Sequence, residues 1–377
     1  MQLPDFLRRC SRRLHADAVC YPLLARFAHG RIATTEQEVQ TAYERLAALS
    51  PDKGRSCLHS NRLTRPTEFD LQIIIPVYNA ENFIDECIGS VLSQQTHYSV
   101  LTVIINDGST DTTRQRLNAY EGMSDIVIID QPNGGFSKAR NTGISTLCAR
   151  YVMFLDADDR LVPGSVETLM DKATASDSDI VEGGYLRFRN EGTVICRYRH
   201  RECAGTDWST LYGYPWGKVY KAGLFADVQF PEGYWFEDTL LPYAVYPRAT
   251  RVTTIPNTVY HYRDHADGIS RRSAGLPRNI DALWVTKRML EDSERLGICR
   301  DERFYHTVLK DFLTNFSRIR GLRSSRTDKD LFIVTTDLMH RYFPDIRTSD
   351  TALRPLELAL RASDFQAYRL YCLFHSF

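Results

Sequence analysis

The sequence has 377 residues, of which 43% are hydrophobic and 25% are charged, as is typical of a globular protein with its own core. Its 47 Lys and Arg residues balance its 47 Asp and Glu residues, which excludes a protein drawn as a whole to nucleic acid. Nine cysteines without a Cys-x-x-Cys pair exclude a zinc finger and a disulfide framework, and free thiols fit a reducing compartment.

The first 66 residues are predicted to form a helical extension and a linker. Apolar residues between Phe6 and Phe27 favour one or two amphipathic helices, and a further helix is expected over residues 35–49. The stretch from Pro51 to Pro66 is polar and rich in turn-forming residues, as in a linker. No signal-peptide core and no apolar run long enough to span a membrane is evident, which favours a cytoplasmic protein. The basic residues from Arg8 to Arg13 would also allow contact with the inner face of the plasma membrane.

From Leu71 onward, short apolar runs alternate with segments of helical spacing. The apolar runs are 73–77, 101–105, 126–129, 151–155 and the start of another at 180–181. The helical segments between them are 82–95, 110–120, 137–148 and 163–175. This alternation predicts an α/β fold with a Rossmann-like, mostly parallel sheet flanked by helices. Beyond Ala274 the apolar spacing is helical throughout, which predicts a helical C-terminal region.

Polar segments follow four of the predicted strands, where ligands bind in open parallel sheets. They are PVYNAE, NDGSTD, NGGFSKARN and LDADD, which begin at residues 76, 106, 133 and 155. Asp156 and Asp158 are two residues apart, so an extended chain places both carboxylates on one side. Paired carboxylates beside a ligand cleft suit Mg²⁺ or Mn²⁺. Because acids after a strand often only cap a turn, the metal interpretation depends on the four segments lying together.

With these motifs, the chain from Leu71 to Arg272 resembles the family 2 glycosyltransferases, which have the GT-A fold. The later motifs WGKVY and FEDTLL, which begin at residues 216 and 236, fit the same family. The resemblance implies a glycosyltransferase domain at 67–272, after the extension at 1–66 and before a helical domain at 273–377. It also implies an inverting enzyme that moves a sugar from a nucleotide diphosphate-sugar, typically a UDP-sugar, to an acceptor hydroxyl in surface polysaccharide or glycoconjugate synthesis.

The resemblance implies a set of residues around the nucleotide-sugar. Tyr78 is expected near the base and Glu81 near the ribose, Asp107 is expected to accept a hydrogen bond from the base, and Arg140 is expected near the phosphates. The whole implied set is Pro76, Tyr78, Asn79, Glu81, Asp107, Gly108, Lys138, Arg140, Asp156, Ala157, Asp158 and Arg263. Taken singly, each has an ordinary structural explanation, such as the end of a strand or a helix cap.

The metal, Mn²⁺ or Mg²⁺, is expected on Asp158 and Asp156 by the same resemblance. His261 is a further candidate ligand, although a histidine between aromatic residues is more often packed in a core. Phosphate oxygens are expected to pair with Arg263 or with Arg271.

For the chemistry, the resemblance assigns Asp238 as the base that removes the acceptor proton, and Glu237 as a residue that orients the acceptor or the sugar. The alternative is that both acids only stabilise a helix N-terminus, an effect of about 0.3–1 kcal/mol. Trp216 and Lys218 are expected near the acceptor and the donor sugar, with core packing as the competing explanation for Trp216.

The expected partners are a nucleotide-sugar donor and a glycan or lipid-linked saccharide acceptor, without nucleic acid. The helical tail could hold the acceptor, mediate self-association or touch a membrane surface. One alternative is a sugar-nucleotide nucleotidyltransferase, but residues 73–80 lack the Gly-rich basic loop of such enzymes. Another is a non-catalytic GT-A-like binding protein, which the presence of both acid motifs disfavours.

Overall fold

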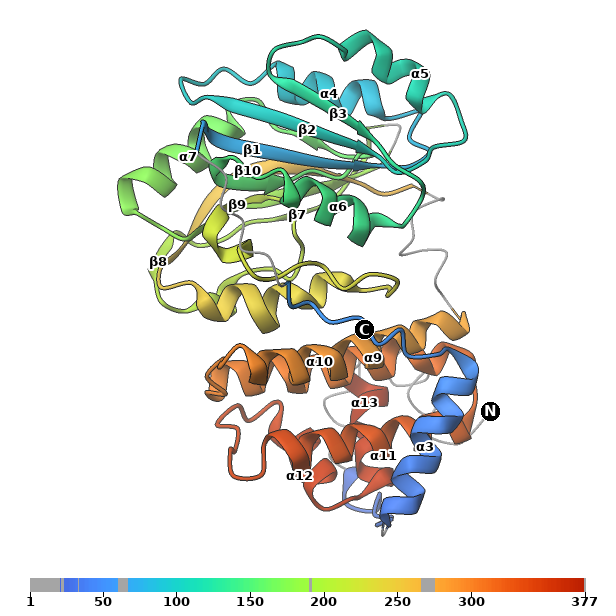
Figure 1. Ribbon diagram of the computed structural model, residues 1–377. Helices are drawn as coiled ribbons and strands as arrows, with labels where there is room; N and C mark the ends of the chain where they lie inside the picture. Colours follow the sequence, from blue (N-terminus) through green and yellow to red (C-terminus); the bar gives the residue numbers. More distant parts are fainter. Residues whose placement is uncertain are drawn as a thin grey trace. The chain divides into compact units, whose positions relative to one another are not determined.

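The computed structural model describes residues 21, 24–32, 34–59, 67–189, 192–265 and 275–375. The chain forms two compact units (Figure 1). The sheet unit comprises the described parts of 55–233 and 237–268, and the helical unit comprises those of 1–54, 234–236 and 269–377. The predicted helices before residue 21, the basic stretch at 8–13 and Arg271 lie outside the described residues.

The sheet unit is built on a ten-stranded sheet whose main order is β3-β2-β1-β4-β9-β6-β10-β5. Strands β1 to β4 run parallel, β6 and β10 form a second parallel pair, and β9 joins the two groups by antiparallel pairing. The α/β fold predicted from the sequence is confirmed. The strands are β1 Phe69–Val77, β2 Val100–Asn106, β3 Ile126–Asp130, β4 Ala149–Phe154, β5 Arg160–Leu161, β6 Ile180–Phe188, β7 Val194–Tyr198, β8 Cys203–Gly205, β9 Lys218–Lys221 and β10 Val252–Arg263.

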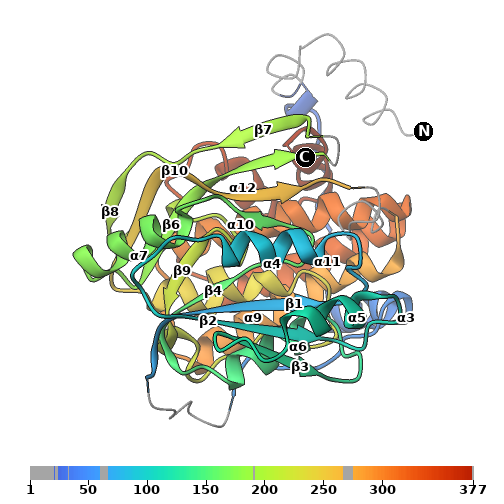
Figure 2. The same cartoon turned by 90° about the horizontal axis from the view of Figure 1, so that it is seen from above.

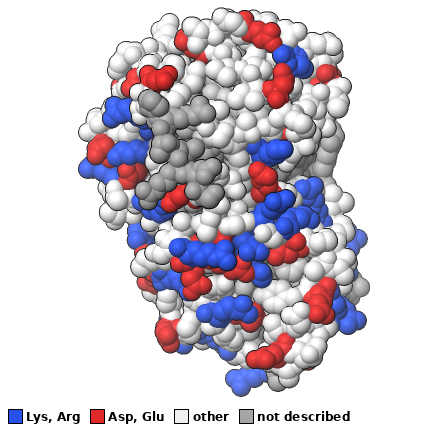
Figure 3. All heavy atoms as spheres, in the orientation of Figure 1, with Lys and Arg blue, Asp and Glu red and all other residues white. Residues whose placement is uncertain are grey.

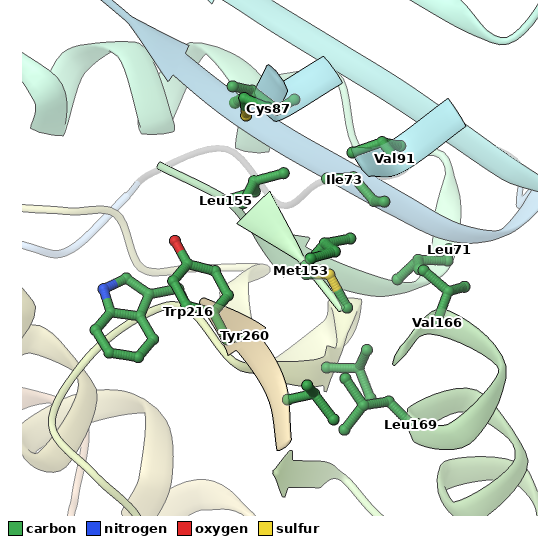
Figure 4. Packing of buried hydrophobic residues seen from close by; sticks show 14 of the residues in the cluster. Leu71, Ile73, Cys87, Val91, Met153, Leu155, Val166, Leu169, Trp216 and Tyr260 are labelled. Carbon is green, nitrogen blue, oxygen red and sulfur yellow. The ribbon is translucent and has the colours of Figure 1, made fainter. Parts of the chain in front are cut away.

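Helices cover both faces of this sheet (Figures 1 and 2). On one face, α4 and α7 pack on the side chains of β1 that include Leu71 and Ile73, and Figure 4 shows part of this core. On the other face, α6 lies against Ile74 and Ile105. Because both faces are covered, the central strands are apolar at nearly every position. The helices are α4 Ile84–Leu92, α5 Thr113–Leu117, α6 Phe136–Ser145 and α7 Ser165–Ser176.

In the described part of the chain, the helical unit combines a helix that precedes the sheet unit in sequence with helices that follow it. Helix α3 begins after the N-cap Thr35, whose side chain forms a capping box with Glu38. It packs on α11, where Nε of Arg45 donates to Asp330 at 2.8 Å and Tyr43 donates to Asp337 at 3.1 Å. The helices of this unit are α3 Glu36–Leu49, α9 Asp281–Arg295, α10 Glu302–Ile319, α11 Ser325–Tyr342, α12 Arg354–Arg361 and α13 Phe365–His375.

Short helical turns complete the described structure: η1 Asn118–Tyr120, η2 Trp208–Thr210, η3 Ala222–Phe225, η4 Glu237–Thr239, η5 Leu241–Val245, η6 Tyr246–Arg248, η7 Pro277–Ile280 and η8 Arg320–Leu322. None of the helices within the described ranges combines the length and apolarity that a bilayer crossing requires. On the face drawn in Figure 3, basic and acidic side chains lie intermixed, in line with the balanced composition.

Alanine substitutions at two helical glycines can test how tightly α6 is packed on the sheet. A Cβ atom at Gly143 of α6 would lie 2.5 Å from Cγ2 of Ile74, whereas one at the exposed Gly89 of α4 would meet no heavy atom within 4 Å. We expect Gly143→Ala to lower the free energy of unfolding by about 1–3 kcal/mol through overpacking. We expect Gly89→Ala to raise it by about 0.5–1 kcal/mol through helix propensity. Urea unfolding of both variants measures the difference, and equal effects would contradict close packing of α6.

Candidate functional site

The loops after β1 and β2 form one connected surface at the carboxyl edge of the sheet. Val77 lies beside Asn106 in the parallel register, so the two loops start side by side. Oδ1 of Asn79 accepts from the backbone N–H of Thr110 at 2.8 Å, and Asn79 adopts a left-handed φ of 50°. The carboxylate of Glu81 accepts from the N–H and the hydroxyl of Thr112, which lowers the pKa of Glu81. Both polar residues therefore fix the loops to each other.

Tyr78 differs from its neighbours because its side chain points into solvent. It is 51% exposed, between the buried end of β1 and the tied loop that follows. Pro76 is half-buried in β1, one residue before the end of the strand. The exposed ring is thus the part of this motif that is available to a flat ligand such as a nucleotide base.

Asp107 holds the loop after β2 to the start of α6. Its buried carboxylate accepts from the backbone N–H groups of Gly134 at 2.9 Å and Gly135 at 2.7 Å, and from the side chain of Gln131 at 2.6 Å. Gly108 makes the close approach feasible, since its φ is +69° and a Cβ there would lie 2.8 Å from N of Asn133. The contact of Asp107 with a base remains a prediction, while its contacts within the chain position α6.

Arg140 on α6 brings the two acidic motifs together. It is 5% exposed, donates to Oδ1 of Asp156 at 2.8 Å and forms a second ion pair with Glu237. One guanidinium therefore joins the segment after β4 to the acid pair at η4. Lys138, also on α6, is half-buried, with its aliphatic chain against Gly134.

Burial shifts the titration of these charged groups. It raises the pKa of Asp156, and it raises the pKa of Glu237 to about 7, while the charge of Arg140 acts in the opposite direction on both. Burial alone would lower the pKa of Arg140, but the two carboxylates raise it overall. The guanidinium therefore stays charged and is the main compensation for the buried Glu237 and the half-buried Asp156.

A histidine that the sequence analysis missed lies beside Asp158. Nε2 of His265 is 2.8 Å from Oδ2 of Asp158, whose side chain is 37% exposed. His261 lies on β10, where its Nδ1 accepts from Nε of Arg160 at 3.3 Å and burial lowers its pKa. The spacing His-x-x-x-His in the sequence could have indicated a second candidate metal ligand. Only the path of the chain after β10 shows that His265, and not His261, lies beside Asp158.

The donor set of Asp158 and His265 fits a divalent cation. A carboxylate oxygen and an imidazole nitrogen both suit Mn²⁺. Neighbouring ligand atoms around an octahedral ion with bonds of about 2.1 Å lie about 3 Å apart, close to the separation seen here. A separate group, His97, Glu167 and Asp171, has ligand atoms within 4.8 Å of one another, after α4 and on α7. That group is not part of the acid segment.

Arg263 and Asp159 brace the acid segment from behind. Nε of Arg263 donates to the backbone oxygen of Asp158 at 2.7 Å, and its guanidinium pairs with Glu86. Asp159 is buried and accepts from the hydroxyl of Tyr260 at 2.7 Å and from N of Arg263 at 2.6 Å. Arg263 was expected to meet a phosphate. In this structure it supports the backbone that carries Asp158, and the phosphate contact remains a prediction.

Trp216 and Lys218 are both buried. Trp216 is 6% exposed and stacks between Tyr214 and Tyr260. Lys218 is fully buried, pairs with Glu182 and donates to the backbone oxygen of Tyr212 at 2.8 Å. Ala157, between the two acids, is also buried. The buried position of Trp216 thus agrees with core packing, the alternative to direct contact with the acceptor or the donor sugar.

Comparisons with known proteins point to one family. The family described as Glycosyl transferase family 2 matches residues 72–234. "Glycosyltransferase GlyA" of Streptococcus pneumoniae is 33% identical over 290 residues, which cover 69% of this chain and 40% of GlyA. "Glycosyltransferase GlyG" of the same organism is 26% identical, covering 60% of this chain and 82% of GlyG. This chain therefore spans less than half of GlyA and most of GlyG.

A further relative is similar in sequence, and a solved structure of a protein with the same name is similar in fold. "Poly(ribitol-phosphate) beta-N-acetylglucosaminyltransferase TarS" of Staphylococcus aureus is 26% identical over 317 residues, covering 79% of this chain and 54% of TarS. The crystal structure of S. aureus TarS 1-349 in complex with UDP-GlcNAc has a TM-score of 0.60 at 20% identity. It covers 80% of this chain and 89% of that fragment, so the likeness extends beyond the sheet unit.

The compensation provided by Arg140 can be tested by its removal. In Arg140→Gln the pKa values of Asp156 and Glu237 rise further, because each carboxylate that ionises then lacks its guanidinium partner. Unfolded carboxyl groups titrate near pH 4, so we expect the variant's free energy of unfolding to fall as pH rises from 5.5 to 8. At pH 8 the loss relative to the parent chain should reach about 3–5 kcal/mol.

The matched control is Arg150→Gln, which removes an exposed arginine of β4 and should change stability by less than about 0.5 kcal/mol. Urea unfolding at both pH values provides the measurement. A loss in Arg140→Gln that is equal at pH 5.5 and pH 8 would contradict the role given to the two acids.

Proposed function

The chain is a family 2 glycosyltransferase, and on that premise we propose that it moves a sugar from a nucleotide diphosphate-sugar to an acceptor hydroxyl with inversion at the anomeric carbon. One observation carries the proposal: Arg140 joins Asp156 to Glu237, so a donor-side acid motif and a candidate base motif share one site. The acceptor is proposed to be a glycan or lipid-linked saccharide of surface polysaccharide or glycoconjugate synthesis. The name of the relative TarS, an N-acetylglucosaminyltransferase that acts on poly(ribitol-phosphate), supports an acceptor that is a polymer bearing hydroxyl groups.

In this proposal the nucleotide lies on the tied loops after β1 and β2. The exposed ring of Tyr78 packs against the base, and Asn79 and Glu81 keep the loop at a fixed distance from β2. Asp107 and Gly108 hold the start of α6, with Lys138, beside this surface. UDP is the proposed nucleotide, because the similar TarS fragment was crystallised with UDP-GlcNAc.

The divalent cation, Mn²⁺ or Mg²⁺, is assigned to Asp158 with His265 as a second ligand. Asp156 lies two residues away and is neutralised by Arg140, so it shapes the site mainly through its charge pair. When bound, the ion supplies positive charge for the diphosphate that leaves. Arg263 and Asp159 keep the backbone around Asp158 in place for this task.

Asp238 is assigned as the base. The ion pair of Glu237 with Arg140 anchors the start of η4, which fixes the position of the next residue. Asp238 takes the proton of the acceptor hydroxyl as that oxygen attacks the anomeric carbon. The nucleoside diphosphate leaves from the opposite face, and this single displacement inverts the configuration. Glu237 thus acts as a positioning residue: its ion pair with Arg140 holds it in place, and the proposed base Asp238 is the next residue in the sequence.

Two isosteric variants separate donor binding from chemistry. Each protein is heated with a panel of UDP-sugars that includes UDP-GlcNAc, with and without Mn²⁺, because a bound ligand raises the melting temperature. We expect Asp158→Asn to lose the Mn²⁺-dependent part of the rise, since an amide is a poorer ligand for a hard cation. We expect Asp238→Asn to keep the rise while UDP release during transfer falls by about 10²–10⁴-fold.

The control is Asp125→Asn, which changes an exposed acid that precedes β3 and should alter neither measurement. Full transfer by Asp238→Asn would remove that residue from the role of base. An unchanged Mn²⁺ dependence in Asp158→Asn would remove the assigned metal ligand.

A further inference from the structure

Two tyrosines of the sheet unit retain large exposed ring surfaces. Tyr214 is 42% exposed and Tyr198 is 41% exposed, although each packs on a buried aromatic ring. An aromatic side chain that is fixed on one face and open to solvent on the other loses little conformational freedom when it binds a ligand. Such rings are therefore candidates for a binding surface.

The ring of Tyr214 is the outer member of a three-ring stack. Its centroid lies 4.6 Å from that of Trp216 at an interplanar angle of 3°, and Trp216 lies 4.5 Å from Tyr260 at 9°. Figure 4 shows Trp216 beside Tyr260 in the core. The hydroxyl of Tyr260 accepts from N of Asp156 at 3.2 Å. The stack thus runs from the surface to the backbone of the acid segment.

The ring of Tyr198 rests on the same buried group. Tyr198 of β7 pairs with Tyr185 of β6, and their rings stack at 4.5 Å and 20°. Tyr185 in turn meets Trp216 edge-on at 4.9 Å and 83°. We call the two exposed rings, Tyr198 and Tyr214, the aromatic platform. The buried rings of Tyr185 and Trp216 lie beneath the platform and support it.

The platform lies within electrostatic range of the proposed catalytic base. Burial, and next the charge of Asp238, raise the pKa of Tyr214. Arg187 lies at the same surface, 38% exposed, with its guanidinium 5.8 Å from the ring centroid of Tyr262 and 3.2 Å from Asp264. Tyr262 also stacks on Trp216, at 5.4 Å. Tyr214 and Tyr262 thus both stack on Trp216, and the guanidinium of Arg187 lies over the ring of Tyr262.

We propose that the aromatic platform is the acceptor subsite, and that the acceptor is an oligosaccharide of pyranose rings. The inference rests on the proposed function, because it takes Asp238 as the base. A pyranose presents a flat face of C–H groups that packs on an aromatic ring, whereas an acyclic polyol chain has no such face. Trp216, expected from the sequence to meet the sugar, acts through Tyr214, which it supports from below.

The test uses saturation-transfer difference NMR on the full chain with four probes. These are cellopentaose, maltopentaose, chitopentaose and poly(ribitol phosphate). We expect the C–H protons of at least one pentasaccharide to receive saturation, and the acyclic polymer to receive none. In Tyr214→Leu the signal should fall by about five- to tenfold, because leucine keeps apolar area but lacks the ring face. Tyr214→Phe keeps the ring and should retain the signal.

Tyr120→Leu is the matched control, since it removes a half-buried tyrosine from η1 of the same unit. Wild-type signal in Tyr214→Leu, binding of the polymer in preference to the pentasaccharides, or binding of none of them at millimolar concentration would overturn the inference. The melting-temperature rise with UDP-sugar and Mn²⁺ is recorded on the same samples. A chain without that rise would contradict the proposed function itself, whatever the acceptor signals show.

Discussion

The charge pair centred on Arg140 is the interaction on which the site depends. Two carboxylates, Asp156 and Glu237, lie in surroundings that disfavour their charge, and one buried guanidinium compensates both. Arg140 can do so only because α6 is held at a fixed place, by the hydrogen bonds of Asp107 to the helix start and by close packing at Gly143. The geometry of the acid motifs is therefore set by a helix that carries no acid of its own.

Exposure divides the motif residues into those that can meet a ligand and those that hold the site. A buried charge needs a partner inside the protein, so Lys218, Arg140 and Arg263 are committed to carboxylates or backbone oxygens. Tyr78 and Asp158 keep open surface. A polar residue in a family motif can therefore serve the reaction from inside the scaffold.

The central strands and their helices were predictable from the sequence, because burial on both faces requires continuous apolar runs and the polar motifs mark where each strand ends. The tertiary pairings were not. β10 lies beside β6 although the two are more than sixty residues apart in sequence, and this pairing places His261 in the sheet and His265 beside Asp158. Judged by local spacing alone, His261 and His265 are equally good candidates for a metal ligand. The burial of Trp216 likewise depends on its stacking with Tyr260 of β10. The residues next to Trp216 in the sequence do not predict this contact.

The pairing of α3 with α11 has a consequence for how the chain is made. Arg45 and Asp330 are separated by 285 positions, so α3 cannot complete its packing on α11 until the ribosome has synthesised the chain beyond residue 330. The parallel strands β1 to β4 need only residues synthesised much earlier. The sheet can thus assemble first during translation, while α3 waits with an incompletely covered apolar face. The pairing of α11 with α3 then closes a long loop, at an entropic cost that grows only slowly with the length of the loop.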